Sequence, residues 1–342
     1  MRTDRAPTAV YVQSNERDGN QVVVFRTSPN GALSDPGPIA VGGGGDGVPH
    51  LASQGCTTLT GDGRALLVTN AGSDDVSLVA VDGAAPRAMG TTSCGSAPKS
   101  ATEHDGLVYV LNTGDPSVCG MRLTAGGLEP ISGSTRALAA GSDPAQVGFS
   151  PDGSALVVTE RSANAIVSYP VGSDGLLGEP LKRSSSGQTP YGFAFTDDGT
   201  LLVVEAFGAA KGKAATSSYA TEGGDVTPVS ASIGNGRSEI CWAVVSDDNR
   251  YLYTTNFADS GISRYAIGDD GSLTLDDPAA GVGIEGHTGL RDEDLTSDGR
   301  FLYALDADSR QVFGWSVGAG GALSAIGSWG QLPATAAGLA AT

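Results

Sequence analysis

Short apolar segments with the period of β-strands recur along the whole chain, and glycine-containing turns separate them. Residues 144–175 are a clear example. One apolar strand ends at Pro151-Asp152-Gly153, a second covers Ala155–Thr159, and a third ends at Asp174-Gly175. Asp-Gly between two apolar runs is a strong hairpin signal, because both residues of such a turn readily adopt positive φ. This segment therefore predicts three consecutive antiparallel strands.

The same unit repeats along the chain. An inner hairpin turn returns at Asp62-Gly63, Asp105-Gly106, Asp152-Gly153, Asp198-Gly199, Asp248-Asn249 and Asp298-Gly299, so that successive turns lie 43, 47, 46, 50 and 50 residues apart. An outer turn returns at Asn30-Gly31, Asp82-Gly83, Gly126-Gly127, Asp174-Gly175, Gly223-Gly224, Asp270-Gly271 and Gly320-Gly321. Repeats of roughly 40–50 residues with about four strands each are typical of β-propeller blades.

The numbers of the two turns differ, and the difference predicts how the ring closes. There are seven outer turns and six inner turns, because the first strand, AVYVQS at residues 9–14, stands in a second-strand position. The C-terminal residues ATAAGLAAT match the start of an innermost strand. We therefore predict an all-β, seven-bladed propeller whose C-terminal strand completes the first blade and leaves no open edge.

A length of 342 residues alone would suggest two domains, but a repeat fold makes a single domain the better interpretation. The expected blades cover approximately residues 9–47 together with 333–342, and then 48–93, 94–140, 141–187, 188–236, 237–285 and 286–332.

The net charge of −18 argues against nucleic acid or an anionic membrane surface as the partner. No apolar run reaches the roughly 18 residues that a membrane-spanning helix needs. A small-molecule substrate is therefore the expected partner. A ring that closes on itself also gives no reason to expect more than a monomer.

Four cysteines are few for a disulfide scaffold. Cys94 precedes the innermost strand of the third blade, and Cys119 follows the bend between its second and third strands, so both should lie near one rim. A disulfide and two free thiols both remain open. Residues 1–8 are too short and polar for a signal peptide. We expect a cytoplasmic protein, with secretion as the alternative if a signal peptide has been removed.

Propeller topology assigns residues to faces. If the inner turns lie on the bottom, the bends between second and third strands and the segments that lead into innermost strands lie on the top, where ligand sites are usually built. The long bend at residues 206–218 is either a lid or a surface loop without a role. The expected substrate-binding residues on the top are His50, Gln146, Tyr191, Phe207, Trp242, Asn256 and Asp292.

Two carboxylates, Glu160 and Glu205, stand at equivalent strand ends in adjacent blades, where other blades carry Asn70, Asn112 and Asn256. Crowding two carboxylates raises one pKa, so the two glutamates form a candidate acid–base pair. In the alternative interpretation, Glu160 simply pairs with a cation, either Arg161, Lys99 or Arg291.

Three further residues complete the candidate catalytic set. Arg291 and Lys99 could hold a carboxylate or stabilise an oxyanion, and His287 is a top-face imidazole. Arg291–Asp294 also places four charges in succession on an innermost strand. Because buried charges are costly unless paired, these residues either form ion pairs across the channel or hold a ligand.

No metal motif of the HxH, HExxH or paired CxxC type is present, and the Gly42–Gly45 run lacks the context of a nucleotide-binding loop. We therefore expect neither a metal nor a cofactor.

Several segments resemble a known family. FSPDGSALVVTERSANAIVSYPVGSDG, GLVYVLNTG and YLYTTNFADSGISRYAIGDDGSL are similar to the YVTN-type repeats of the seven-bladed propeller lactonases, which include 6-phosphogluconolactonase and a carboxymuconate-cyclising enzyme. The resemblance covers essentially the whole chain. It implies a Glu at the position of Glu160. The family's PHxH segment lacks its second His here, and its P-R-H segment reads Pro144-Ala145-Gln146.

Together these observations predict a lactonase-like enzyme that acts on a small carboxylated or carbonyl-bearing substrate in a top funnel by acid–base chemistry. The reaction would be lactone hydrolysis or a related ring-opening, isomerising or eliminating step. The alternative is a non-catalytic propeller that binds a protein or peptide on its top rim. An exposed aromatic patch would favour binding, whereas a deep funnel where Glu160, Glu205 and Arg291 converge would favour the enzyme.

Overall fold

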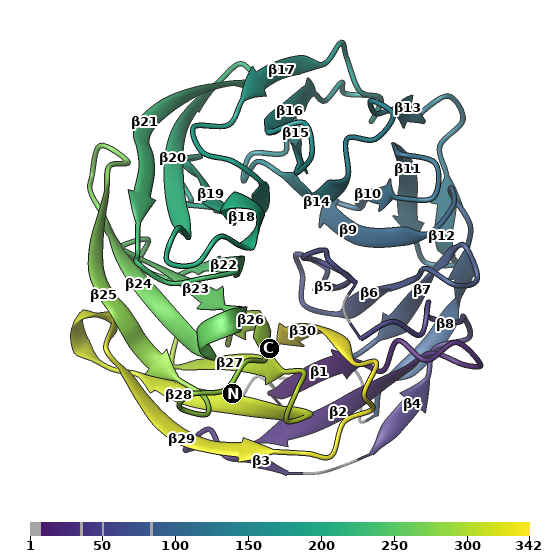
Figure 1. Ribbon diagram of the computed structural model, residues 1–342. Coiled ribbons are helices and arrows are strands. Elements are labelled where there is room, and N and C mark those ends of the chain that lie inside the picture. Colours follow the sequence, from purple (N-terminus) through teal and green to yellow (C-terminus); the bar gives the residue numbers. More distant parts are fainter. Residues whose placement is uncertain (1–7, 35–36, 50, 83–84) are drawn as a thin grey trace, which may run out of the picture.

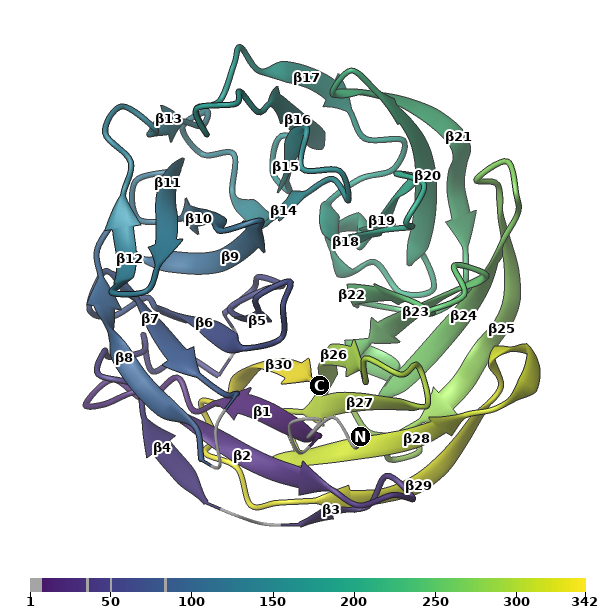
Figure 2. The ribbon, with the colours of Figure 1, turned by 180° about the vertical axis from the view of Figure 1, so that it is seen from behind.

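Seven antiparallel sheets stand in a ring and follow one another in chain order (Figures 1 and 2). The computed structural model describes residues 8–34, 37–49, 51–82 and 85–342. The prediction of an all-β, seven-bladed propeller is confirmed. No helix within the described residues is long and apolar enough to cross a membrane.

The first three blades are built from these strands: β1 (Ala9–Gln13), β2 (Gln21–Thr27), β3 (Leu33–Ser34), β4 (Pro38–Ala40) and β30 (Ala337–Ala341) in blade one; β5 (Thr57–Leu59), β6 (Ala65–Asn70), β7 (Asp75–Ala80) and β8 (Arg87–Thr92) in blade two; β9 (Pro98–His104), β10 (Leu107–Asn112), β11 (Ser117–Thr124), β12 (Gly127–Pro130) and β13 (Arg136–Ala137) in blade three.

The remaining blades each have four strands: β14 (Pro144–Phe149), β15 (Ala155–Glu160), β16 (Ala165–Pro170) and β17 (Leu181–Ser184) in blade four; β18 (Pro190–Phe195), β19 (Leu201–Glu205), β20 (Ala215–Glu222) and β21 (Asp225–Gly234) in blade five; β22 (Ile240–Val245), β23 (Tyr251–Asn256), β24 (Gly261–Ile267) and β25 (Leu273–Val282) in blade six; β26 (Leu290–Leu295), β27 (Phe301–Asp306), β28 (Gln311–Val317) and β29 (Leu323–Trp329) in blade seven. Three 3-10 turns, η1 (Phe207–Ala209), η2 (Phe257–Asp259) and η3 (Ala319–Gly321), interrupt the strands.

The C-terminal strand closes the ring, as the turn count predicted. β30 pairs antiparallel with β1, with Val10 opposite Ala341 and Tyr11 opposite Ala340 (Figure 1). The backbone N–H of Thr342 donates to the carbonyl of Ala9 at 3.0 Å. The innermost strand of blade one therefore comes from the opposite end of the chain.

The inner turns occur where the sequence predicts them, but most have a different conformation. At Asp105-Gly106 both residues have positive φ, +47° and +78°, as expected for a two-residue hairpin. At Asp62, Asp152, Asp198 and Asp298 only the following glycine does. These aspartates instead accept a hydrogen bond from a Ser or Thr hydroxyl two residues earlier, which satisfies the turn through a side chain and lowers the pKa of each carboxyl.

The core lies between the blades and not in the middle of the ring. Each pair of neighbouring blades encloses its own apolar cluster, such as Phe25 against Phe301 between blades one and seven, and Tyr191 against Ile240 between blades five and six. Strands that are apolar on both faces are therefore required, which explains continuous runs such as ALVVTE at Ala155–Glu160. The polar ends of these strands are left to form the loops of the two faces.

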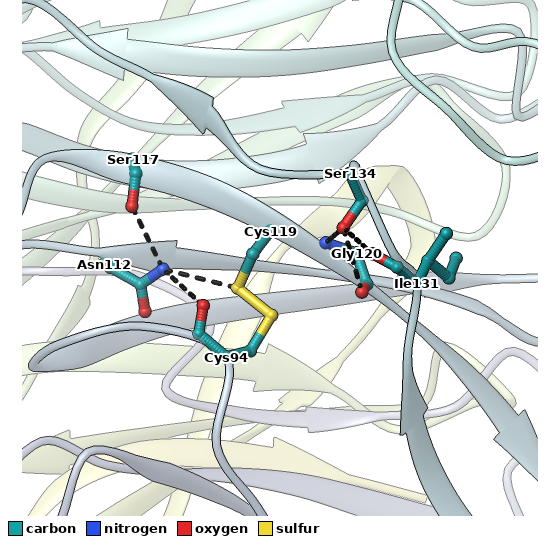
Figure 3. Close-up of a disulfide and its surroundings, with 7 residues drawn as sticks. All are labelled: Cys94, Asn112, Ser117, Cys119, Gly120, Ile131 and Ser134. Carbon is teal, nitrogen blue, oxygen red and sulfur yellow. Dashed lines mark hydrogen bonds between the residues drawn. A yellow bond between two sulfur atoms is a disulfide. The ribbon is translucent and has the colours of Figure 1, made fainter.

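A disulfide joins Cys94 to Cys119, with their Cα atoms 6.0 Å apart (Figure 3). It links the loop before β9 to β11 within blade three, so of the two alternatives the disulfide is the one that forms. Asn112 lies beside it and donates to the carbonyl of Cys94 at 3.5 Å. Cys56 and Cys241 are buried free thiols.

Candidate functional site

The segment that leads into β5 closes the top of the ring. Residues 51–55, which we call the channel plug, contact strands of distant blades. The Ser53 hydroxyl donates to the carbonyl of Ala145 in blade four. The Gln54 side chain donates to the carbonyl of Ala243 in blade six at 2.9 Å and accepts from the N–H of that residue at 3.1 Å. The open top funnel expected from the sequence is therefore filled by protein.

Below the plug, a cavity of about 390 Å³ is lined by the innermost strands, which surround the centre of the ring in both ribbon views (Figures 1 and 2). Gln146 belongs to this lining. Its side chain accepts from the N–H of Phe193 at 2.7 Å and donates to the carbonyl of the same residue at 3.0 Å. Its amide therefore satisfies the edge of β18, which leaves it little capacity for a substrate.

Glu160 does not meet Glu205 in a shared acid–base site. At the end of β15, Glu160 is 1% exposed, and its Oε2 lies 2.6 Å from Nζ of Lys182 in the outermost strand β17. The alternative interpretation, a cation partner, is therefore what the geometry gives. The partner is Lys182 and none of the three cations that the sequence suggested.

The Glu205 carboxylate is also occupied by hydrogen bonds from nearby residues. It accepts hydrogen bonds from the N–H of Gly187 at 2.7 Å and from the hydroxyls of Ser185, Ser217 and Ser232. The asparagines at this strand end in other blades are also hydrogen-bonded within their own blade. Their amides donate to a serine of the third strand, as in Asn70–Ser77, Asn112–Ser117 and Asn256–Ser263. The position connects adjacent strands, and Asn256, fully buried there, is part of the same pattern.

The other predicted residues are distributed over the top face. Lys99 forms an ion pair with Asp46 at 3.3 Å. His287 is exposed in the loop before β26. Phe207 is half-buried in η1, and His50 lies outside the described residues. The loop around η1 is held by backbone hydrogen bonds from Ala206 to Thr189 and from Phe207 to Gln188, and its residues Ala206, Gly208 and Ala209 line a pocket.

Arg291 and Tyr191, by contrast, do come together, in a top-face pocket of about 260 Å³. Its walls are largely apolar. The lining residues are Thr189, Tyr191, Ala206, Gly208, Ala209, Glu239, Ile240, Cys241, Phe257 and Arg291. We call this the Arg291 pocket. Because drug-sized sites begin at roughly 300 Å³, the pocket suits a small ligand.

Arg291 is held in place by two contacts. Its Nη1 donates to the carbonyl of Pro49 at 2.5 Å, and its guanidinium stands 4.3 Å from the ring centre of Phe257. Two neighbouring cations are neutralised, Lys99 by Asp46 and Arg161 by Asp143. Arg291 forms no ion pair with any described residue, so its charge remains available to an anion.

Glu239 was not among the predicted site residues, and it lines the same pocket. It precedes β22 with a left-handed φ of +54°, and its carbonyl accepts from the N–H of Phe257 at 2.9 Å. The equivalent residues in blades three, four and five, namely Ala97, Asp143 and Thr189, share this conformation. Within the described part of the chain, the Glu239 carboxylate has no hydrogen-bond or ion-pair partner. Aligning the blades at this position would have pointed to it.

Tyr191 lines the pocket and stacks on Trp242, which lines the central cavity. Their rings stack with centroids 4.8 Å apart and an angle of 15° between planes, and Trp242 is 1% exposed. Burial raises the pKa of the Tyr191 phenol well above its usual range, and the nearby Arg161 and Arg291 guanidiniums oppose the rise. Burial likewise raises the pKa of the Cys241 thiol to about 12, so this thiol stays protonated.

The acids that follow Arg291 on β26 do not pair across the channel. Asp292, Glu293 and Asp294 form no ion pair with any residue in the described ranges, so of the two alternatives the ion-pair network does not form there. Burial raises the pKa of Asp292 to about 6 and that of Asp294 to about 7. It raises the pKa of Glu293, whose two carboxyl oxygens lack hydrogen-bond partners, well above the usual range.

No three His, Cys, Asp or Glu side chains among the described residues are arranged to hold a metal ion. Large exposed apolar residues in these ranges are also few and scattered, namely Val48, Val229 and Val282. The aromatic patch that would favour peptide binding is therefore missing from the described surface.

The fold and the pocket define a seven-bladed propeller with a small, largely apolar top-face site that carries a guanidinium and a carboxylate without an ion-pair partner among the described residues. The model of the family "Lactonase, 7-bladed beta-propeller" matches residues 7–206. The chain therefore belongs to the seven-bladed β-propeller lactonase family. No curated protein matches the chain significantly.

Solved structures share the whole fold at low sequence identity. The periplasmic gluconolactonase of Pseudomonas aeruginosa is 16% identical over 98% of both chains, with a TM-score of 0.73. A Bacteroides fragilis protein provisionally named a 6-phosphogluconolactonase is 18% identical over 100% of this chain and 99% of its own, with a TM-score of 0.74. A Lactobacillus plantarum protein is 17% identical over 98% and 99%, with a TM-score of 0.77. At these identities the likeness establishes the fold alone.

Proposed function

We propose that the protein is a hydrolase that opens a small lactone in the Arg291 pocket. The observation that carries the proposal is that Arg291 and Glu239, neither of which has an ion-pair partner in the described ranges, line one small apolar pocket. Membership of the lactonase family supports the reaction class. The acid–base role expected for Glu160 and Glu205 passes in this proposal to Glu239.

The two groups supply what lactone hydrolysis requires. Glu239 accepts a proton from a water molecule as the water oxygen adds to the lactone carbonyl carbon. Arg291 stabilises the negative charge that develops on the carbonyl oxygen, and the apolar walls strengthen this interaction by excluding water. When the ring C–O bond breaks, the ring oxygen takes the proton from Glu239, and a hydroxy acid is released.

The pocket's surroundings favour an anionic or strongly polarised substrate. The protein as a whole is strongly acidic, yet the pocket presents a cation that Phe257 and Pro49 hold in place. A carboxylated lactone would suit such a site, and it would leave through the same opening as a hydroxy diacid.

The test is a hydrolysis assay on a panel of small lactones with wild type, Arg291→Ala, Glu239→Gln and Glu160→Gln. We expect kcat to fall about 100-fold or more in the first two variants, the range for loss of an oxyanion donor or a general base. Arg300→Ala is the matched arginine control, because Arg300 pairs with Asp298 at an inner turn.

The variants also separate the competing assignments. Activity lost in Glu160→Gln but kept in Glu239→Gln would return the acid–base role to Glu160. No turnover of any lactone by wild type would overturn hydrolysis and shift attention to isomerising or eliminating reactions of the same substrates, or to peptide binding.

We further infer that the protein matures in an oxidising compartment. The disulfide between Cys94 and Cys119 supports this, because structural disulfides rarely persist in a reducing cytosol. The alternative of secretion, left open by the sequence, is therefore preferred to a cytoplasmic location.

A further inference from the structure

The 3-10 turn η2, which follows the second strand of blade six, joins the two chain segments that carry the charged groups of the Arg291 pocket. The backbone N–H of Phe257, its first residue, donates to the carbonyl of Glu239 at 2.9 Å. The carbonyl of Phe257 accepts from the N–H of Gly289 at 3.0 Å. Gly289 stands in the loop before β26, two residues before Arg291. The main chain of one residue is therefore hydrogen-bonded to both segments.

The connection that η2 makes between blades six and seven differs from two others at the equivalent position. Before β9 and before β18, the left-handed residue donates its N–H to a side chain of the preceding blade. Ala97 donates to the carboxylate of Asp74, and Thr189 donates to the side-chain oxygen of Asn164, each at 2.7 Å. Before β26 the acceptor is a main-chain carbonyl. Because a main-chain acceptor adds no rotatable side-chain bonds, it holds the two blades at a fixed spacing.

Gly289 is suited to this connection. Its φ is +139°, and a Cβ there would lie 2.2 Å from Oδ1 of Asp306, so only glycine fits. Its carbonyl accepts from the N–H of Ala307 at 3.0 Å, so both of its main-chain polar groups are bonded. The chain therefore enters β26 in a defined position, and Arg291 extends from a fixed backbone.

The ring of Phe257 then holds the Arg291 side chain. The guanidinium carbon lies 4.3 Å from the ring centre. The other arginine–ring contacts in the described part of the chain are longer, between 4.8 and 5.6 Å. The same ring is half-buried and packs against the apolar cluster of blades five and six. It is therefore fixed by packing on one side while it contacts the cation on the other.

We propose that Phe257 is a positioning residue that sets the separation between Glu239 and Arg291: its main chain joins the segments that carry them, and its ring directs the guanidinium. The kinetic part of this inference rests on the proposed function, whereas its structural part does not. Phe257 makes and breaks no bond in the reaction. It acts through Arg291, which stabilises the charge on the lactone carbonyl oxygen.

The first experiment measures how fast phenylglyoxal, an arginine-specific reagent, labels each arginine of the folded protein, as followed by peptide mass spectrometry. In Phe257→Leu we expect labelling of Arg291 to become about threefold faster or more, the factor that corresponds to an exposed cation–π contact. Phe257→Tyr keeps an aromatic ring and should be labelled at the wild-type rate. Phe257→Met, a second variant without a ring, tests the same contact if Phe257→Leu does not fold.

Tyr251→Leu is the matched control. Tyr251 is a half-buried aromatic residue of the same blade, and the guanidinium of Arg250 lies 5.6 Å from its ring centre. This variant should speed the labelling of Arg250 and leave that of Arg291 unchanged. Phe257→Leu should have the opposite selectivity.

Kinetics supply the second measurement. If the lactone assay detects turnover, Phe257→Leu should lower kcat about tenfold and change KM little, because a misdirected guanidinium loses its interaction with charge that develops only in the transition state. In an Arg291→Ala background the same substitution should change kcat less than about twofold, since the ring then has no guanidinium to hold.

The outcomes separate this inference from the proposed function. Unchanged labelling of Arg291 in Phe257→Leu would overturn the inference, whether or not any lactone is hydrolysed. Equal losses of kcat in the wild-type and Arg291→Ala backgrounds would also overturn it, because they would show a structural effect that does not act through Arg291. Faster labelling of Arg291 without turnover of any lactone would support the positioning of Arg291 and contradict hydrolysis alone.

Discussion

A polar residue at the end of the second strand is hydrogen-bonded to a serine of the third strand in four blades. Asn70, Asn112 and Asn256 donate to third-strand serines, while Glu205 accepts from Ser217. The same geometry accommodates an amide or a carboxylate because serine both donates and accepts. Glu160 is the exception that needs a cation, and Lys182 supplies it.

This pair yields a prediction about stability. Lys182→Ala should lower the free energy of unfolding more than Glu160→Gln, because the lysine variant leaves a buried carboxylate without its cation. We expect losses of about 3 kcal/mol for Lys182→Ala and about 1 kcal/mol for Glu160→Gln. Urea denaturation at pH 7 measures both. Equal losses would mean that the Lys182–Glu160 ion pair stabilises the fold no more than a neutral hydrogen bond does.

At this scale the sequence predicted less of the site than of the fold. It placed Arg291 and Tyr191 on the top face, and they do share a pocket. It could not identify Lys182 as the partner of Glu160, because pairing between third and fourth strands is set by irregular outer loops. Glu239 was missed because only the folded structure brings it close to two bends and to a guanidinium from another blade.

Strand β26 carries three consecutive buried acids, Asp292, Glu293 and Asp294, whose pKa values burial raises. Raised folded-state pKa values mean that the folded protein holds these protons more tightly than the unfolded chain does. The protonated carboxyls therefore contribute fully to the free energy of unfolding below the pKa values of the unfolded chain, near pH 4. This contribution is lost as the pH rises through about 6 for Asp292 and about 7 for Asp294.

The inner-turn aspartates give the free energy of unfolding the opposite pH dependence. Hydrogen bonds lower the pKa of Asp62, Asp152 and Asp198, so their contribution is present at higher pH and is lost as pH falls through the lowered values. We therefore predict that the melting temperature is highest near about pH 5, which lies between the lowered pKa values of the turn aspartates and the raised pKa values of the β26 acids. Between pH 5 and pH 8 it should fall by about 5 °C or more.

Asp294→Asn tests the assignment to β26. The amide oxygen of Asn can still accept from Ala341, so the variant removes the titration and keeps the hydrogen bond. Thermal unfolding followed by circular dichroism from pH 4 to pH 8 should show a flatter alkaline side than wild type. A melting temperature that rises from pH 5 to pH 8 would contradict the raised pKa values.

The channel plug shows why an element can be missed although its strand is found. β5 is only three residues long, because the segment before it crosses the ring before entering the sheet. Nothing in the apolar pattern of residues 48–56 distinguishes a loop over the channel from one at the rim. The plug is recognisable only through contacts such as Gln54 with Ala243, residues 189 positions apart.

For the molecule as a whole, counting turns was sufficient to predict the architecture and its closure. Blade number, strand order and the C-terminal origin of the last strand follow from the repeat, since each blade needs a neighbour on both faces to bury its apolar strands. The turn conformations did not follow as simply. Five of the inner turns use a Ser or Thr hydroxyl and an Asp carboxylate where the dipeptide alone suggested positive φ at both residues.

The disulfide gives the final prediction. Joining Cys94 to Cys119 restricts the unfolded chain, and for residues 25 apart in sequence the expected stabilisation is about 3 kcal/mol. Cys94→Ala/Cys119→Ala should lose this amount in urea denaturation, and a reducing agent should bring wild type to a similar stability while leaving the double variant unchanged.

Thiol titration in denaturant connects this result to the compartment. Protein from an oxidising compartment should show two thiols, Cys56 and Cys241, and four after reduction. Because Cys119 is 1% exposed, its oxidation requires that the pair meet an oxidant during folding, before the blade closes over it. Protein that shows four thiols in an oxidising compartment, with unchanged stability on reduction, would leave the cytoplasmic alternative in place.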